Sequence, residues 1–220
     1  MSNPGKVFAV AIAAMGLFGV TAASAATIDF TTADPFTQPD VFGVSVSVTA
    51  NGGSGTATTF DGGALGSGAP CQNSPLACIS DGIGVGDDEI TGNGVQSVDV
   101  AFSGPLSVTG FHFLDLFFDP NANDQEAAQV LFNGDVVASY TFAALEAFQV
   151  EGGYGFFAIA PTVATSLRFI AASGNDGVGN PDYALAGIDV SAVPLPASGL
   201  LLLFAVGGFG FLSRRRGAAA

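Results

Sequence analysis

The residues best suited to bind a cation lie in one short segment, residues 119–124 (DPNAND). Its oxygen-bearing side chains are those of Asp119, Asn121, Asn123 and Asp124. Calcium prefers such closely spaced oxygens, so the segment predicts a calcium site with Asp119 as its first ligand. It differs from an EF-hand, because Asp124 replaces the required Gly and Val130 the required Glu. Asp and Asn are also frequent turn formers, so an ordinary turn is the alternative interpretation.

Two other loops are rich in oxygen ligands. They contain Asp87, Asp88 and Glu89, and Asn175, Asp176, Asn180 and Asp182. All 19 acidic residues lie between residues 26 and 192, where Arg168 is the only basic residue, so this region carries 1 − 19 = −18 formal charges. Such a surface favours cations, and it makes nucleic acid and anionic membrane surfaces poor partners. A solvated acidic face that only keeps the protein soluble is the alternative.

The chain has one histidine, His112, inside a phenylalanine-rich run. We interpret it as a hydrogen-bonded structural residue rather than a catalytic base, because no free cysteine nucleophile is expected beside it. The sequence contains neither a G-x-S-x-G serine motif nor a Walker phosphate loop. Glycoside hydrolysis needs only two carboxylates, but nothing in the sequence singles out a pair. We therefore predict a protein that is not an enzyme and has no catalytic residues.

Cys71 and Cys78 are the only two cysteines. In an exported protein such a pair predicts a disulfide. Closing so small a loop stabilises the fold by about 2.5 kcal/mol on the chain-entropy estimate. A redox motif has fewer intervening residues, and a metal site needs more soft ligands than this segment offers. We interpret the pair as a structural clip.

The elements that must position these residues are strands, because apolar and polar residues alternate along most of the chain. The expected strands are residues 42–50, 55–60, 98–102, 111–118, 128–132, 135–142, 154–160, 165–171 and 183–190. Asn133-Gly134 predicts a tight hairpin, because both turn positions need positive φ. Only residues 142–148 (FAALEAF) have a helical composition. The pattern predicts an all-β fold, an antiparallel β-sandwich of jelly-roll type.

The N-terminal segment has the composition of a secretory signal peptide. An apolar run covers residues 7–20, and small residues of the A-x-A type end at Ala25, which predicts cleavage before Ala26. The apolar run is too short to span a bilayer comfortably. We therefore expect residues 1–25 to form a signal helix that signal peptidase removes, and residues 26–192 to form one exported domain.

The C-terminal segment has three parts in a fixed order. They are the motif Val193, Pro194, Leu195, Pro196 and Ala197, then the apolar run 198–212, then the basic cluster Arg214, Arg215 and Arg216. The apolar run predicts a transmembrane helix that is marginal for a hydrocarbon core of roughly 30 Å. The arginines should stay cytoplasmic, which leaves the domain outside.

This arrangement resembles the PEP-CTERM family of sorting tails, in the variant with the signature VPLPA, which residues 193–197 match letter for letter. The resemblance covers about an eighth of the chain and implies recognition by an exosortase, an integral-membrane protease or transpeptidase. Residues 193–216 would then be the sorting signal, followed by a short extension at residues 217–220. The implied route runs from an inner-membrane intermediate to the cell surface or extracellular matrix of a Gram-negative bacterium. A plain membrane anchor is the alternative, although it needs no Pro-Leu-Pro motif.

We therefore predict an exported, exosortase-sorted surface or matrix protein, associated with exopolysaccharide, with a structural or adhesive β-sandwich domain. A glycan-binding, lectin-like module is the alternative, by analogy of fold alone. Sugar sites use exposed aromatic residues, but the domain has no Trp, and its only tyrosines are Tyr140, Tyr154 and Tyr183. Most of its 15 phenylalanines fall at positions expected to face the core. An exposed tyrosine beside an acidic loop would favour glycan binding.

Overall fold

The structure, a computed structural model, describes residues 24–60, 74–92, 95–119, 124–143, 153–172 and 181–193. The predicted transmembrane helix and residues 1–23 of the predicted signal segment lie outside these ranges and stay predictions. The described part of the chain contains strands and no helix, and accordingly no helix long and apolar enough to cross a membrane. Of the helix-like segment 142–148, the first two residues end a strand and the others lie outside the described residues.

The described elements are eleven strands. They are β1 (Ala25–Asp29), β2 (Val46–Asn51), β3 (Gly55–Thr56), β4 (Gly84–Val85), β5 (Ser97–Leu114), β6 (Phe118–Asp119), β7 (Asp124–Gln125), β8 (Ala127–Phe132), β9 (Asp135–Ala143), β10 (Gly155–Ala171) and β11 (Ala184–Ala192). Seven of them form one antiparallel sheet in the order β1-β11-β5-β10-β8-β9, with β2 also paired to β5. The strands β3 with β4, and β6 with β7, form two small separate ladders.

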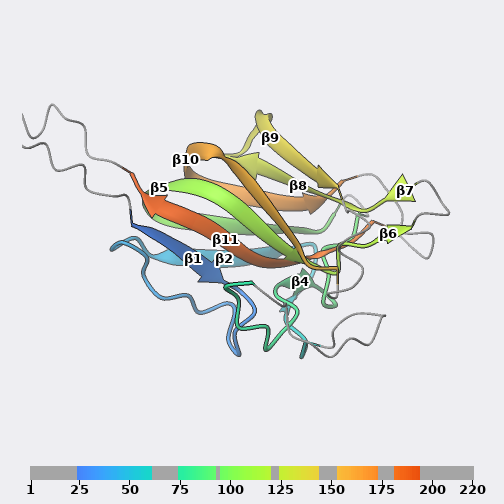
Figure 1. Cartoon of the computed structure of the whole chain (residues 1–220). Helices are drawn as coiled ribbons and strands as arrows, with labels where there is room; N and C mark the ends of the chain where they lie inside the picture. The colour runs from blue at the N-terminus through green and yellow to red at the C-terminus, as the bar shows by residue number, and fades with distance from the viewer. Residues whose placement is uncertain are drawn as a thin grey trace, which may run out of the picture.

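Two long strands fold this sheet into two layers (Figure 1). The second half of β5 pairs with β11 and with the first half of β10, whereas its first half pairs with β2 and with the second half of β10. We call β1, β11 and the adjoining halves of β5 and β10 the first layer. The second layer consists of β2, β8, β9 and the other halves of β5 and β10.

Phe111 shows that the two layers pack face to face. It is fully buried, and its ring centroid lies 5.7 Å from that of Phe169 and 5.4 Å from that of Phe142. In the ladder, however, Phe169 pairs with Val98, near the opposite end of β5. A straight strand would separate Phe111 from Val98 by about 40 Å. β5 must therefore bend, and the aromatic core lies between its two halves.

Prolines stand at irregularities of the two long strands. The pairing of β5 with β10 shifts register between Ala158 and Thr162 and again around Ser166. Pro161 lies in the first shift, and Pro105 lies in the unpaired part of β5 opposite the second. Proline lacks an N–H donor and is confined to strand edges and bulges, so these positions suit a bend.

The predicted all-β antiparallel fold is confirmed, with one difference in the sheet. A jelly roll has two sheets, whereas here both layers belong to one hydrogen-bonded sheet. Residues 98–102 and 111–114 belong to the single strand β5, which ends four residues before the expected end at 118, and 155–160 and 165–171 belong to the single strand β10.

The hairpin between β8 and β9 is confirmed. Asn133 and Gly134 have φ values of 53° and 73°, as an Asn-Gly hairpin turn requires. The Asn133 side chain also accepts a hydrogen bond from the Thr165 N–H at 2.8 Å. This contact ties the turn to β10.

The two ends of the domain lie together. β1 is antiparallel to β11, with Ala25 opposite Ser191, so the first residues of β1 and the last of β11 reach the same end of the first layer (Figure 1). β1 was not among the expected strands.

Candidate functional site

The first layer has an outer face that points away from the aromatic core. Phe156 of β10, His112 of β5 and Gly187 of β11 lie side by side on this face, because they are paired in register. The adjacent row consists of Ala158, Gly110, Asp189 and Thr27.

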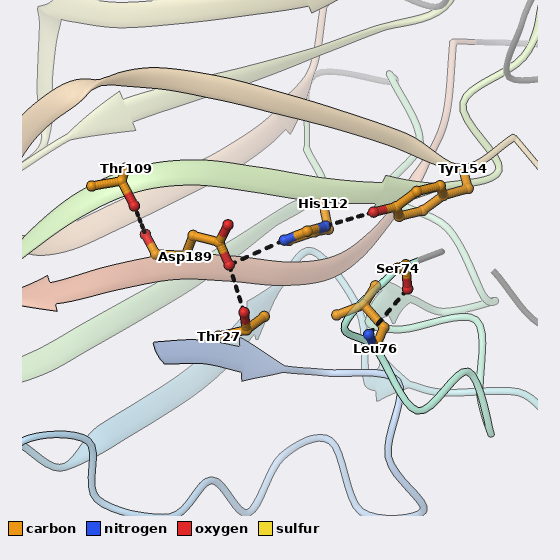
Figure 2. Close-up of polar contacts among 7 residues, drawn as sticks. All are labelled: Thr27, Ser74, Leu76, Thr109, His112, Tyr154 and Asp189. Atoms are coloured by element: carbon orange, nitrogen blue, oxygen red, sulfur yellow. Dashed lines mark hydrogen bonds and ion pairs between the residues drawn. The ribbon is translucent and has the colours of Figure 1, made fainter. Parts of the chain in front are cut away.

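His112 lies at the centre of this face and its side chain is only 2% exposed. Its Nδ1 is 2.9 Å from the Tyr154 hydroxyl and its Nε2 is 3.2 Å from Oδ1 of Asp189 (Figure 2). Burial lowers the pKa of His112 below its ordinary value, although the hydrogen bond to Asp189 opposes this effect. The neutral ring therefore donates through Nε2 to the carboxylate and accepts from Tyr154 at Nδ1. The prediction of a hydrogen-bonded histidine is confirmed.

Asp189 is held firmly but stays in contact with solvent. Its Oδ1 accepts hydrogen bonds from the Thr27 hydroxyl at 2.6 Å and from His112. Its backbone carbonyl accepts one from the Thr109 hydroxyl at 3.3 Å (Figure 2). The side chain is 26% exposed, and within the described residues no hydrogen bond reaches Oδ2. One carboxylate oxygen is thus available to a ligand.

Phe156 presents an exposed aromatic ring beside this carboxylate. It is 45% exposed and stacks on the His112 ring, with centroids 4.6 Å apart and planes inclined by 30°. A Cβ added to Gly110 would lie 2.7 Å from Cε2 of Phe156, so the ring covers this glycine and a larger residue would displace it. We call Phe156, Ala158 and Asp189, supported by His112, the outer-face platform.

A loop covers the other end of the same face. Leu76 and Cys78 pack over Leu114, Ala184 and Ala186. The Cys78 N–H donates to the Thr31 hydroxyl at 2.8 Å, and the Leu76 N–H donates to Oγ of Ser74 at 3.0 Å (Figure 2). The outer face is therefore closed at this end and open around the platform.

A second polar group gathers carboxylates around Glu89, after β4. The pKa of Glu89 is raised to about 9, first by burial and then by the negative charges of Asp182, Asp115, Asp88 and Asp87. The structure thus brings together two loops that the sequence marked as oxygen-rich. In the part of the chain that the structure describes, however, no group of three His, Cys, Asp or Glu residues is placed to hold a metal ion.

A third polar group lies on the outer face of the second layer. Arg168 donates from Nε and Nη2 to the two carboxylate oxygens of Asp99, at 2.7 and 2.8 Å. These hydrogen bonds lower the pKa of Asp99, and they raise the pKa of Arg168. The pair borders a surface hollow of about 280 Å³ near Gly134. Both partners are partly exposed, so the ion pair itself contributes little to stability.

The predicted calcium ligands are only partly described. Asn121 and Asn123 lie outside the described residues, while Asp119 and Asp124 are opposite each other in the β6–β7 ladder. Calcium binding stays a prediction.

The remaining predicted residues fall at the ends of the described ranges. Cys78 has no free thiol, but Cys71 is not described, so their pairing stays a prediction. Ala25 and Ala26, which flank the predicted signal cleavage site, begin β1. Val193 is the last described residue; Pro194, Leu195, Pro196, Ala197, Arg214, Arg215 and Arg216 lie outside.

The tyrosines do not provide the exposed ring that a sugar site needs. Tyr183 is fully buried, Tyr140 packs against Phe132, and Tyr154 is occupied with His112. The exposed ring belongs instead to Phe156, which sequence reasoning missed together with Asp189. The sequence did indicate an outward-facing ring, because Phe156 and Phe157 are adjacent in an expected strand and must point to opposite faces.

No family model matches this sequence, and no curated protein matches it. Among solved structures, "Truncated AlyQ with CBM32 and alginate lyase domains" is similar at 9% identity and a TM-score of 0.35, covering 68% of this chain and 35% of that chain. The "CBM32 of AlyQ in complex with 4,5-unsaturated mannuronic acid" is similar at 11% identity and a TM-score of 0.30, covering 64% and 95%. The family 32 CBM from C. perfringens NanJ in complex with galactose is similar at 14% identity and a TM-score of 0.31, covering 64% and 93%. At these scores the likeness carries no argument about family, ligand or activity.

Proposed function

We propose that this chain is an exported protein of the cell surface or extracellular matrix, and that its sandwich domain adheres to polysaccharide through the outer-face platform. The observation that carries the adhesive role is the exposed ring of Phe156 beside the partly exposed carboxylate of Asp189. A sugar ring presents C–H groups that pack on an aromatic face and hydroxyls that donate to a carboxylate. The platform offers both contacts on one surface.

The support beneath the platform favours binding by a preformed surface. Asp189 is oriented by Thr27 and His112, and His112 is in turn held by Tyr154. Phe156 rests on His112. A ligand therefore loses little affinity to the ordering of these side chains. The proposal includes no catalytic step, and His112 acts in it as a positioning residue.

The ends of the domain support delivery by the C-terminal tail. β11 ends at Ala192, directly before the VPLPA motif, and the proline at position 194 cannot donate to a ladder. Because Ala25 lies opposite Ser191, the predicted signal cleavage site and the start of the VPLPA motif adjoin the same end of the sandwich, which is consistent with the proposal. We propose signal peptidase and an exosortase as the processing enzymes, with an inner-membrane intermediate between the two steps.

Cell fractionation tests the proposed export and the proposed removal of the tail. Wild-type chain should appear at the surface or in the matrix fraction, shortened by the mass of the tail. Replacing Pro194 and Pro196 by alanine should leave full-length chain in the inner membrane, because a helical segment cannot lie extended in a protease cleft. Wild-type chain found only at full length in the inner membrane would instead identify a plain anchor.

The Phe156→Ala variant tests adhesion separately from delivery. It should be shortened like the wild type but be lost from the matrix into the medium. Equal retention of both proteins in the matrix would refute adhesion through the platform and leave a purely structural role.

A further inference from the structure

We infer that the ligand of the outer-face platform is an electrically neutral polysaccharide, bound as a chain along β10, rather than a polyuronate or another anionic polymer. This inference rests on the proposed function, because it names the ligand class of the same site.

The charges around the platform repel an anionic ligand. Asp189 is part of the platform, and Asp29 is close enough to act electrostatically on His112. The imidazole of His112 is neutral, because burial lowers its pKa. A ligand carboxylate beside Oδ2 of Asp189 would therefore meet negative charge without a compensating cation.

The domain's one basic side chain is too far from the platform to neutralise an anionic ligand there. Arg168 lies on the second layer and is bound through two nitrogens to Asp99. The domain as a whole carries −18 formal charges, which disfavours the approach of a polyanion from any side at moderate ionic strength. Sugar hydroxyls need no such cation, because they donate directly to a carboxylate.

The shape of the exposed strip suits a chain rather than a single sugar. Phe156, Ala158 and Val163 are exposed along β10, and Val163 is 52% exposed. In this part of β10 the described pairing is with β5 only, since β8 begins to pair at Leu167. The strip from Phe156 to Val163 therefore follows a sheet edge alongside His112 to Ser107 of β5, a distance of roughly 16 Å, which is longer than one pyranose ring.

Affinity electrophoresis of the full-length chain in mild detergent tests this inference. The gels contain hydroxyethylcellulose, galactomannan or dextran as neutral polymers, and polygalacturonate or alginate as anionic ones. A chelator is present in every gel, so that divalent ions cannot bridge carboxylates. We expect retardation by at least one neutral polymer, with an affinity at least tenfold higher than for either anionic polymer.

Three variants test which surface binds the polymer and whether the charge of Asp189 weakens binding of anionic polymers. Phe156→Ala should lose at least tenfold in affinity for the neutral polymer. Phe42→Ala is the matched control, because Phe42 is 39% exposed but lies outside the platform, and it should bind as the wild type does. Asp189→Asn should bind the anionic polymers better than the wild type, because it removes the repelling charge and keeps an acceptor oxygen. Thermal melting confirms that each variant is folded.

The outcomes separate this inference from the proposed function. Binding to polyuronate that equals or exceeds binding to neutral polymers, and that depends on Phe156, overturns the inference but leaves adhesion through the platform intact. Absence of Phe156-dependent retardation in every gel overturns both.

Discussion

Replacing Glu89 by glutamine should stabilise the protein at alkaline pH and leave it nearly unchanged at acidic pH. Burial and the charges of Asp182 and Asp115 raise the pKa of Glu89 from 4.5 to about 9. The folded protein therefore keeps a proton on this carboxyl at neutral pH. Glutamine has the shape of the protonated side chain and cannot ionise. The variant therefore keeps an uncharged side chain at this position at every pH.

The sign and size of the effect follow from proton linkage. Between about pH 4.5 and 9 the folded state holds a proton that the unfolded chain has released. The stability from this proton is complete below pH 4.5 and is lost as the pH rises toward 9. One proton limits the slope to about 1.4 kcal/mol per pH unit. Glu89 is only half-buried and is screened by solvent, so we expect the wild type to lose roughly 1–3 kcal/mol relative to the variant between pH 5 and 8.

Urea unfolding of both proteins at pH 5 and pH 8, with a chelator present, measures this difference. Asp40→Asn is the control, because Asp40 is exposed and its replacement removes one negative charge without changing a buried group. The control retains Glu89, so its free energy of unfolding should fall between pH 5 and pH 8 as that of the wild type does. The reasoning is refuted if Glu89→Gln has the same pH dependence as the wild type, or if Asp40→Asn stabilises as much at pH 8.

Three further predictions concern the turn, the cysteines and the calcium loop. Gly134→Val should destabilise the protein by more than about 0.5 kcal/mol, the usual surface range. Nothing lies within 4 Å of an added Cβ, so the cost comes from the φ of 73°, which a β-branched residue adopts poorly. Gly134→Asn should be tolerated, and equal stability of both variants in urea would contradict the assigned turn. Intact mass of the exported protein should show Ala26 at the N-terminus and two fewer hydrogens for a Cys71–Cys78 bond, whereas free thiols would exclude the clip. Calcium should raise the melting temperature above that in chelator at fixed ionic strength, and Asp119→Asn should weaken the effect; an equal shift with magnesium would leave only charge screening.

Local rules were enough for much of the fold. Alternation with period two requires only that one face of a strand be buried, so it located β8, β9 and β11 within one or two residues. The Asn133-Gly134 turn was predictable for the same reason, because positive φ is a property of those two residues. The hydrogen-bonded state of His112 also followed from general physics, since a buried imidazole needs partners.

The continuity of β5 and β10 could not be predicted from the sequence, because it depends on pairing with distant strands. Pro105 and Pro161 lie between segments that the sequence divides into separate strands. In the structure each strand continues through its proline, because neighbouring strands supply hydrogen bonds on both sides of the bend, as in the bond from the Ser103 N–H to the Ser45 carbonyl at 3.0 Å. Only tertiary pairing could show that Pro105 stands where β5 passes from one layer to the other, and that Pro161 lies in a bulge of β10.

The signal and sorting segments are predicted by sequence alone, because hydropathy, charge order and a five-residue motif are local properties of residues 1–25 and 193–216. The platform is different, since it joins residues from three strands, β5, β10 and β11, that are distant in sequence. Phe156 is apolar and adjoins another phenylalanine, so composition alone places it in the core. Its exposure was decided by the register of β10 against β5, which puts Phe157 inward and leaves Phe156 over Gly110 beside Asp189.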